Sequence, residues 1–312
     1  MALVEPTRVT NLEGLLGMVQ AEVRKAVVGY DKAVEALLVA AVSGGHVLLE
    51  GPPGIAKTLL AGSMARSLGV DFSRIQFTTD TTPEEITGSA HRRAGELVFE
   101  PGPVFTNILL ADEINRTPPR MQASLLEAMG ERHVTVQGMT RWLPSPFMVI
   151  ATQNPHEQAG IFPLPESQLD RFLFKLVLSY GTEEDEIGVL GIPHRGLAHD
   201  MLEDVRPLVG PVELDRSLKE ISETELPRPV AETIVQLIRR TRELPGVILG
   251  CSPRAGVHLM TAAKANARMA GRTSATVPDV LYMAPLVLPH RIMVERDVSQ
   301  HDIVAQAAAT IG

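Results

Sequence analysis

The spacing of hydrophobic and polar positions divides the chain into two parts, with a seam near residues 193–215. Before the seam, short apolar runs alternate with stretches in which apolar residues recur every three or four positions, which predicts strands alternating with helices. After the seam, nearly every stretch has the helical period. We therefore predict an α/β domain with a parallel sheet over residues 1–195, a linker over 196–210 and an all-helical domain over 211–312.

Five compact apolar runs are predicted to form the sheet, at residues 46–50, 74–77, 107–111, 147–152 and 172–178. Helices are predicted at 12–27 and 31–43 in the first part, and at 229–242, 253–269, 278–288 and 299–309 in the second. Two further segments, 88–105 and 133–143, are predicted to be β-hairpins with turns at Ala94-Gly95 and Gln137-Gly138. The hairpins are therefore insertions into the α/β pattern.

Composition narrows the kinds of protein to consider. Hydrophobic residues make up 45% of the chain and charged residues 21%, so the chain can bury a core. Its 29 basic and 37 acidic side chains give a net charge of −8, which argues against a protein that coats nucleic acid. The single cysteine, Cys251, excludes a disulfide within the chain, and we interpret it as a small filler side chain.

The sequence has no sign of a membrane or export segment. No basic stretch followed by an apolar one begins the chain, and apolar runs such as 36–42 are too short to span a bilayer. We therefore expect a cytoplasmic protein without membrane insertion. The histidines lack metal-ligand spacing and are interpreted as surface or capping residues: His194, His199, His290 and His301.

A glycine- and proline-rich loop at 51–58, Gly-Pro-Pro-Gly-Ile-Ala-Lys-Thr, follows a predicted strand and precedes a helix. Such loops bind phosphates, because small residues let backbone N–H groups curl around the anion at a helix N-terminus. Lys57 would reach the outer phosphates and Thr58 would bind Mg²⁺. Ala56 departs from the general pattern, which has glycine there. The sequence thus predicts that ATP and Mg²⁺ bind at Gly51, Pro52, Pro53, Gly54, Ile55, Ala56, Lys57, Thr58 and Leu59.

Polar residues end two other predicted strands. Asp112 and Glu113 follow an apolar run, where ligands of open α/β sheets bind. Asp112 would hold Mg²⁺, and Glu113 would orient and deprotonate the attacking water. Asn154 follows a third strand and could hydrogen-bond that water or the γ-phosphate. Acidic residues and Asn-Pro turns are also common at strand ends, so the fixed order of the motifs carries the argument.

Five segments, in this order, resemble the MoxR family of AAA+ ATPases: GPPGIAKT at 51–58, LLADEINR at 109–116, ATQNP at 151–155, FPLPESQLDRF at 162–172 and SPRA at 252–255. The resemblance implies a P-loop AAA+ domain with a parallel five-stranded sheet and a helical lid, with nucleotide between them. It also implies these roles: Lys57 and Thr58 as Walker A, Asp112 and Glu113 as Walker B, Asn154 as sensor 1, Arg171 as the arginine finger, Arg254 as sensor 2, and Val28 and Gly29 at the adenine.

The arginines have simpler interpretations as well. Arg171 could form a salt bridge at a helix end, and Arg254 could be a solvated residue of a first helical turn. Arg116 could face a subunit interface or pair with a neighbouring carboxylate, and the sequence does not choose between these. An arginine supplied by another subunit stabilises the phosphoryl transition state in known cases.

The resemblance further implies a homo-oligomeric ring, expected to be a hexamer, that remodels or matures a client protein, including by metal or cofactor insertion. It implies a partner with a von Willebrand A domain. We hypothesise that His91-Arg92-Arg93 and residues 134–141 line the pore of the ring. The alternatives are a nucleic-acid motor related to MCM helicases, a small-molecule P-loop kinase and a nucleotide-gated scaffold. The net charge disfavours the motor, and an intact Glu113 disfavours the scaffold.

Overall fold

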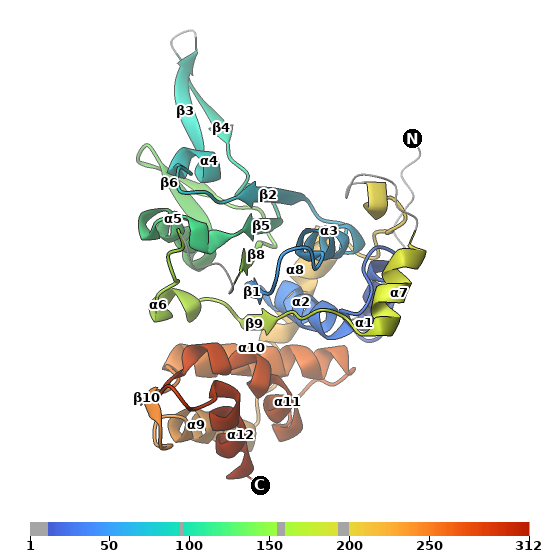
Figure 1. Cartoon of the computed structure of the whole chain (residues 1–312), viewed down its shortest axis with the longest axis vertical. Coiled ribbons are helices and arrows are strands. Elements are labelled where there is room, and N and C mark those ends of the chain that lie inside the picture. Colours follow the sequence, from blue (N-terminus) through green and yellow to red (C-terminus); the bar gives the residue numbers. More distant parts are fainter. Residues whose placement is uncertain (1–11, 94–95, 155–159, 193–199, 312) are drawn as a thin grey trace.

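A computed structural model describes residues 12–93, 96–154, 160–192 and 200–311 of the chain. Five parallel strands form its central sheet, in the order β2 (Phe72–Gln76), β5 (Ile108–Asp112), β8 (Met148–Gln153), β1 (Val47–Glu50) and β9 (Phe174–Val177) (Figure 1). All four pairings are parallel. The predicted five-stranded sheet is therefore confirmed, and the carboxyl ends of its strands meet at one edge.

Successive residues of each buried strand face two separate hydrophobic cores. On β1 and β5, Val47 and Ile108 belong to one core, whereas Leu48 and Leu109 belong to the other. The first core is shared with α1 (Leu15–Val23), α2 (Asp31–Ser43), α3 (Lys57–Ser67) and the C-terminal helices. The second contains α4 (Pro83–Thr87), α5 (Pro119–Glu131) and the hairpins. Helix α1 is shorter than the predicted 12–27.

Both predicted hairpins form. One pairs β3 (Gly88–Arg93) with β4 (Glu96–Pro101), and the other pairs β6 (His133–Val136) with β7 (Met139–Trp142). Gln137 and Gly138 have φ of 50° and 78°, as a type I′ turn requires. The predicted turn Ala94-Gly95 lies outside the described residues. The β3–β4 hairpin projects from the end of the molecule opposite the C-terminus (Figure 1).

The C-terminal part is a bundle of five helices: α8 (Pro211–Ser222), α9 (Arg228–Arg240), α10 (Pro253–Met269), α11 (Val277–Val287) and α12 (Gln300–Ala309). Four of them match predicted helices, and α8 is additional. The bundle also contains a small antiparallel sheet of β10 (Val247–Leu249) and β11 (Met293–Val294), so it is not entirely helical. Helix α10 packs on α2, beneath the sheet in Figure 1.

Short elements complete the connections. Helices α6 (Glu166–Leu169) and α7 (Glu183–Gly191) flank β9, and single turns of 3₁₀ helix occur at Ile114–Arg116, at Asp200–Leu202 and at η3 (Pro289–Arg291). Thr182 caps α7 in a capping box with Asp185. Within the described ranges, no helix is long and apolar enough to cross a bilayer. The domain boundaries given above remain a prediction.

Candidate functional site

The phosphate-loop segment connects β1 to α3 and closes on itself. Lys57 Nζ donates a hydrogen bond of 2.7 Å to the carbonyl oxygen of Gly51. A Cβ atom at Gly51 would lie 2.7 Å from the carbonyl oxygen of Leu178, so only glycine fits there. Ala56 has φ of 60°, in the left-handed region that favours glycine. The backbone thus adopts a glycine-like conformation at the position where the general motif has glycine.

Asp112, the last residue of β5, is buried and accepts hydrogen bonds from two sides. The Thr152 hydroxyl donates to one carboxylate oxygen at 2.5 Å, and Arg74 Nη2 lies 2.6 Å from the other. The same Thr152 oxygen accepts the backbone N–H of Glu113 at 2.9 Å. Since a hydroxyl has one hydrogen and two lone pairs, Thr152 can make both bonds at once. It therefore links the ends of β5 and β8.

Glu113 follows directly, with φ of 57°, a conformation that costs energy for a non-glycine residue. Its carboxylate accepts a hydrogen bond of 2.9 Å from Gln76 and forms an ion pair of 2.6 Å with Arg116. Arg116 therefore contacts a neighbouring carboxylate, one of the two interpretations left open by the sequence. Arg74 and Gln76 were not among the predicted site residues, although they are the polar residues on either side of Ile75 in β2.

The predicted phosphate and metal residues lie on adjacent strands. Lys57 and Thr58 follow β1, Asp112 ends β5, and the buried Asn154 follows β8, which lies between them in the sheet. The structure thus brings these side chains to one edge, as the order of the motifs predicts. Carboxylate and hydroxyl oxygens are ligands that Mg²⁺ accepts, so Asp112 and Thr58 fit a magnesium ion.

A cavity of about 400 Å³ lies beside the phosphate loop. Its lining includes Val28, Ile55, Ala56, Leu59 and Val189 of α7. The apolar side chains in its wall suit an adenine ring. The neighbouring Gly29 has φ of 86°, and a Cβ there would lie 2.8 Å from Cγ of Asp185. In the described part of the chain, all lining residues of this cavity precede residue 202, so the lid does not cover it.

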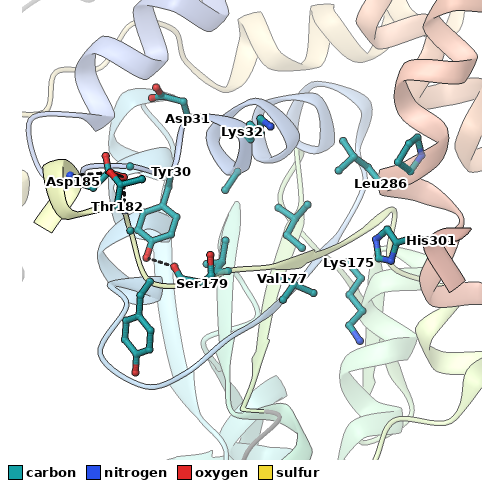
Figure 2. A pocket seen from close by; sticks show the side chains of 17 residues that line it. Tyr30, Asp31, Lys32, Lys175, Val177, Ser179, Thr182, Asp185, Leu286 and His301 are labelled. Carbon is teal, nitrogen blue, oxygen red and sulfur yellow. Dashed lines mark hydrogen bonds between the residues drawn. The ribbon is translucent and has the colours of Figure 1, made fainter. Parts of the chain in front are cut away.

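A second cavity, of about 560 Å³, lies where the sheet meets the lid (Figure 2). Lys175 and Val177 of β9 face Leu286 and His301 across it. Tyr30 lines both cavities and donates a 3.2 Å hydrogen bond to the carbonyl oxygen of Ser179. Among the described residues, no phosphate-loop residue lines this second cavity. The expectation that nucleotide binds between the two domains of one chain remains a prediction.

Arg171 and Arg254 contact parts of the molecule other than the phosphate loop. Arg171 Nη1 donates to the carbonyl oxygen of Leu126 on α5 at 2.5 Å. Arg254, in the first turn of α10, has a 53% exposed side chain and lies 3.6 Å from Asp170, the residue before Arg171. In the described structure, neither arginine lines the cavity beside the phosphate loop.

Two interpretations of single residues have clear outcomes. Cys251 is fully buried, and burial raises the pKa of its thiol to about 11, which confirms a small filler side chain. His290 was interpreted as a surface or capping residue, and a surface position is wrong. Its ring is buried, Nε2 lies 3.2 Å from the carbonyl oxygen of Phe172, and burial lowers its pKa well below the usual value. His301 is exposed, and His194 and His199 lie outside the described residues.

Comparison with known proteins agrees with this architecture. Residues 46–174 match the ATPase family associated with various cellular activities (AAA), and residues 239–309 match the AAA lid domain. The solved structure of a "putative ATPase" from Cytophaga hutchinsonii is 34% identical, with a TM-score of 0.87 over 96% of this chain and 95% of that one. The fold and the site define a nucleotide-binding AAA+ ATPase that hydrolyses ATP.

Two relatives match over most of their length. YeaC of Bacillus subtilis is 42% identical over 95% of this chain and 92% of its own. The chaperone MoxR1 of Mycobacterium tuberculosis is 40% identical over 90% of this chain and 76% of its own. The chain therefore belongs to the MoxR family of AAA+ ATPases, and the resemblance noted in its motifs is confirmed.

Proposed function

We propose that the phosphate loop and the ends of β5 and β8 form one magnesium-dependent catalytic site for ATP hydrolysis. Lys57 and the backbone of residues 51–59 would hold the phosphates, and the cavity beside Val28 and Gly29 would hold the base. Thr58 and Asp112 would hold Mg²⁺, which neutralises charge on the phosphate oxygens when bound. Glu113 would orient the attacking water and accept its proton, with Asn154 beside it.

The observation that carries this proposal is the link made by Thr152. One hydroxyl ties the Asp112 carboxylate to the backbone of Glu113, at 2.5 Å and 2.9 Å. This contact fixes the predicted metal ligand and the predicted base relative to each other. Fixed polar groups stabilise a transition state because they need no reorganisation during the reaction.

We further propose that the chain works as a homo-oligomeric ring, expected to be a hexamer. In such a ring, Arg171 and Arg254 would complete the site of the neighbouring subunit. The support is their position, since both lie next to Asp170 and away from the cavity beside their own phosphate loop. Arginine in that role stabilises charge on the transferred phosphoryl group.

The biological role is a proposal from the family. We propose a cytoplasmic chaperone-like ATPase that remodels or matures a client protein, including by metal or cofactor insertion, with a von Willebrand A domain partner. The hairpins supply a candidate contact surface. His91 and Arg92 are exposed on β3, and Trp142 on β7 has an exposed fraction of 73%. Exposed tryptophan and arginine side chains are enriched in protein-binding surfaces.

The test of the catalytic site uses three variants and a mixture of two of them. Glu113→Gln is expected to bind ATP but to hydrolyse it at least 100-fold more slowly, as expected for loss of a general base. Lys57→Ala is expected to lose ATP binding. Mixing Glu113→Gln with Arg171→Ala should restore part of the hydrolysis, because some interfaces then pair an intact Glu113 with an intact Arg171. Full activity of Arg171→Ala alone would refute the role of Arg171.

A further inference from the structure

Asp170, the residue before Arg171, is a meeting point of the large domain and the lid. Arg291 Nε lies 2.9 Å from Asp170 Oδ1, and Ser252 Oγ donates to Oδ2 at 3.0 Å. Arg254 Nη1 lies 3.6 Å from the same Oδ2. All three partners belong to the lid. The Arg291 side chain is 1% exposed and that of Asp170 is 16% exposed, so the contact is largely shielded from water.

Lid residues also hold the backbone on both sides of Arg171. Arg291 donates to the carbonyl oxygens of Asp170 at 3.3 Å and of Leu173 at 3.4 Å, and it also donates to that of Phe172. His290 Nε2 is 3.2 Å from the Phe172 carbonyl, and as a neutral ring it donates there. The guanidinium group of Arg171 itself forms no hydrogen bond with the lid residues named here and is directed toward α5.

A buried ion pair is weak evidence for stability, because desolvation of both charges offsets their attraction. Its effect on geometry is stronger. Arginine presents five N–H donors in a rigid plane. The donors of Arg291 contact Asp170, Phe172 and Leu173, the residues on both sides of Arg171. A displacement of about 1 Å at a catalytic group can cost 100-fold in rate. Because the backbone position of Arg171 sets where its long side chain ends, fixing that backbone limits such a displacement.

We propose that Asp170 is a positioning residue through which the lid of one subunit fixes Arg171 for the nucleotide site of the next subunit. This inference rests on the proposed function, in which Arg171 completes the neighbouring site. The lid is thereby coupled to hydrolysis at a site that it does not line in its own chain. A change in the seating of the lid at one subunit changes the hydrolysis rate at the adjacent subunit.

The test starts from Asp170→Asn in the full chain, which keeps the shape of the side chain and removes its charge. We expect kcat for ATP hydrolysis to fall about tenfold or more, with the Kd for a fluorescent ATP analogue unchanged within about twofold. Mixing with Glu113→Gln subunits should raise hydrolysis again, because the Glu113 of an Asp170→Asn subunit then meets an Arg171 held by an intact Asp170. Mixing with Arg171→Ala subunits should give no recovery.

Asp215→Asn is the matched control, because Asp215 also joins the lid to the large domain, through a 2.7 Å hydrogen bond from Ser145. It should leave hydrolysis unchanged. If Arg171→Ala is rescued by Glu113→Gln but Asp170→Asn is not, the positioning role is wrong and the proposed function stands. If Arg171→Ala is fully active alone, both are wrong.

A second pair of variants covers the case in which Asp170→Asn does not fold. Ser252→Ala removes one hydrogen bond to Asp170 and the cap of α10, whereas Ser299→Ala removes only the equivalent cap of α12. Each loss of a cap costs about 1 kcal/mol, so both variants should fold. We expect kcat to fall several-fold for Ser252→Ala and not for Ser299→Ala. Equal rates in the two variants would overturn the proposal.

Discussion

The backbone N–H of Val149 donates a hydrogen bond of 3.0 Å to Nδ1 of His46, inside the large domain. Nε2 of the same ring lies 3.1 Å from the carbonyl oxygen of Met129. The ring must therefore be neutral, with its hydrogen on Nε2, since protonation of Nδ1 would break the bond from Val149. Burial lowers the pKa of His46 to about 4, and burial together with Arg291 lowers that of His258 to about 3.

These lowered values predict acid sensitivity of the fold. Each histidine binds a proton in the unfolded chain below pH 6.5 but in the folded chain only near its lowered pKa. Stability is therefore unaffected above about pH 7 and falls as the pH drops from 6.5. At pH 5.5 each buried histidine should cost about 1 kcal/mol relative to pH 7.5, measured by urea unfolding. In His46→Asn the loss should be smaller by that amount, and an equal loss would contradict this account.

Thr152 gives a prediction for catalysis. Thr152→Val keeps the volume but removes both hydrogen bonds to the ends of β5, and it leaves the Glu113 N–H without its partner. We expect hydrolysis to fall at least tenfold, with a smaller change in ATP affinity, measured by steady-state kinetics and equilibrium binding. Thr152→Ser keeps the hydroxyl and should retain most activity. Equal activity in the valine and serine variants would show that the link is not needed.

Ala56 gives a prediction for stability. Its φ of 60° is strained for alanine and unstrained for glycine. Ala56→Gly should therefore leave stability unchanged or raise it by up to about 1 kcal/mol, despite the greater freedom of glycine in the unfolded chain. Ala305→Gly, at an exposed position in the interior of α12, should lower stability by about 1 kcal/mol. A similar loss in both variants, measured by urea unfolding, would contradict the prediction.

The two hairpins support each other, which predicts coupled protection from hydrogen exchange. The guanidinium carbon of Arg141 lies 3.8 Å from the centre of the Phe99 ring, and Gln137 donates to the carbonyl oxygen of Ala90 at 2.8 Å. Arg141→Ala removes a contact of about 1 kcal/mol, so amides of β3 and β4 should exchange about fivefold faster.

In that variant, amides of the central sheet should keep their exchange rates. Arg120→Ala, at an exposed position of α5, is the control and should change neither set of amides. Unchanged protection of β3 and β4 in Arg141→Ala would mean that the hairpins are held independently.

Much of the fold could be predicted because its signals are local. Each central strand is a short apolar run, and the loop at 51–58 adjoins one of them. Helix α8 was not predicted as a separate helix because its first residues fall within the seam at 193–215, although Leu214, Leu218 and Ile221 have the helical spacing. The β10–β11 pair was missed because Val247 and Val294 pair across most of the lid, which a local pattern cannot show.

The candidate site likewise has residues that local motifs reveal and residues whose contacts depend on the folded structure. Lys57, Asp112 and Glu113 could be found from the order of their motifs. Arg74 and Gln76 could not, because their contacts follow from the pairing of β2 with β5, in which Gln76 lies opposite Asp112. The partnership of Asp170 with Arg291 joins residues 121 positions apart and needs the packed lid to be visible.

The continuous core beneath the sheet limits how this ATPase can move. Leu37 of α2 and Leu259 of α10 belong to one hydrophobic cluster, so the lid is anchored to the large domain by packed apolar side chains. Swinging the lid away would expose that surface to water, at about 2.5 kcal/mol for every 100 Å². We therefore expect the lid to stay packed on the large domain during the ATP cycle, with only small changes in its seating, and the larger movements to occur between protomers.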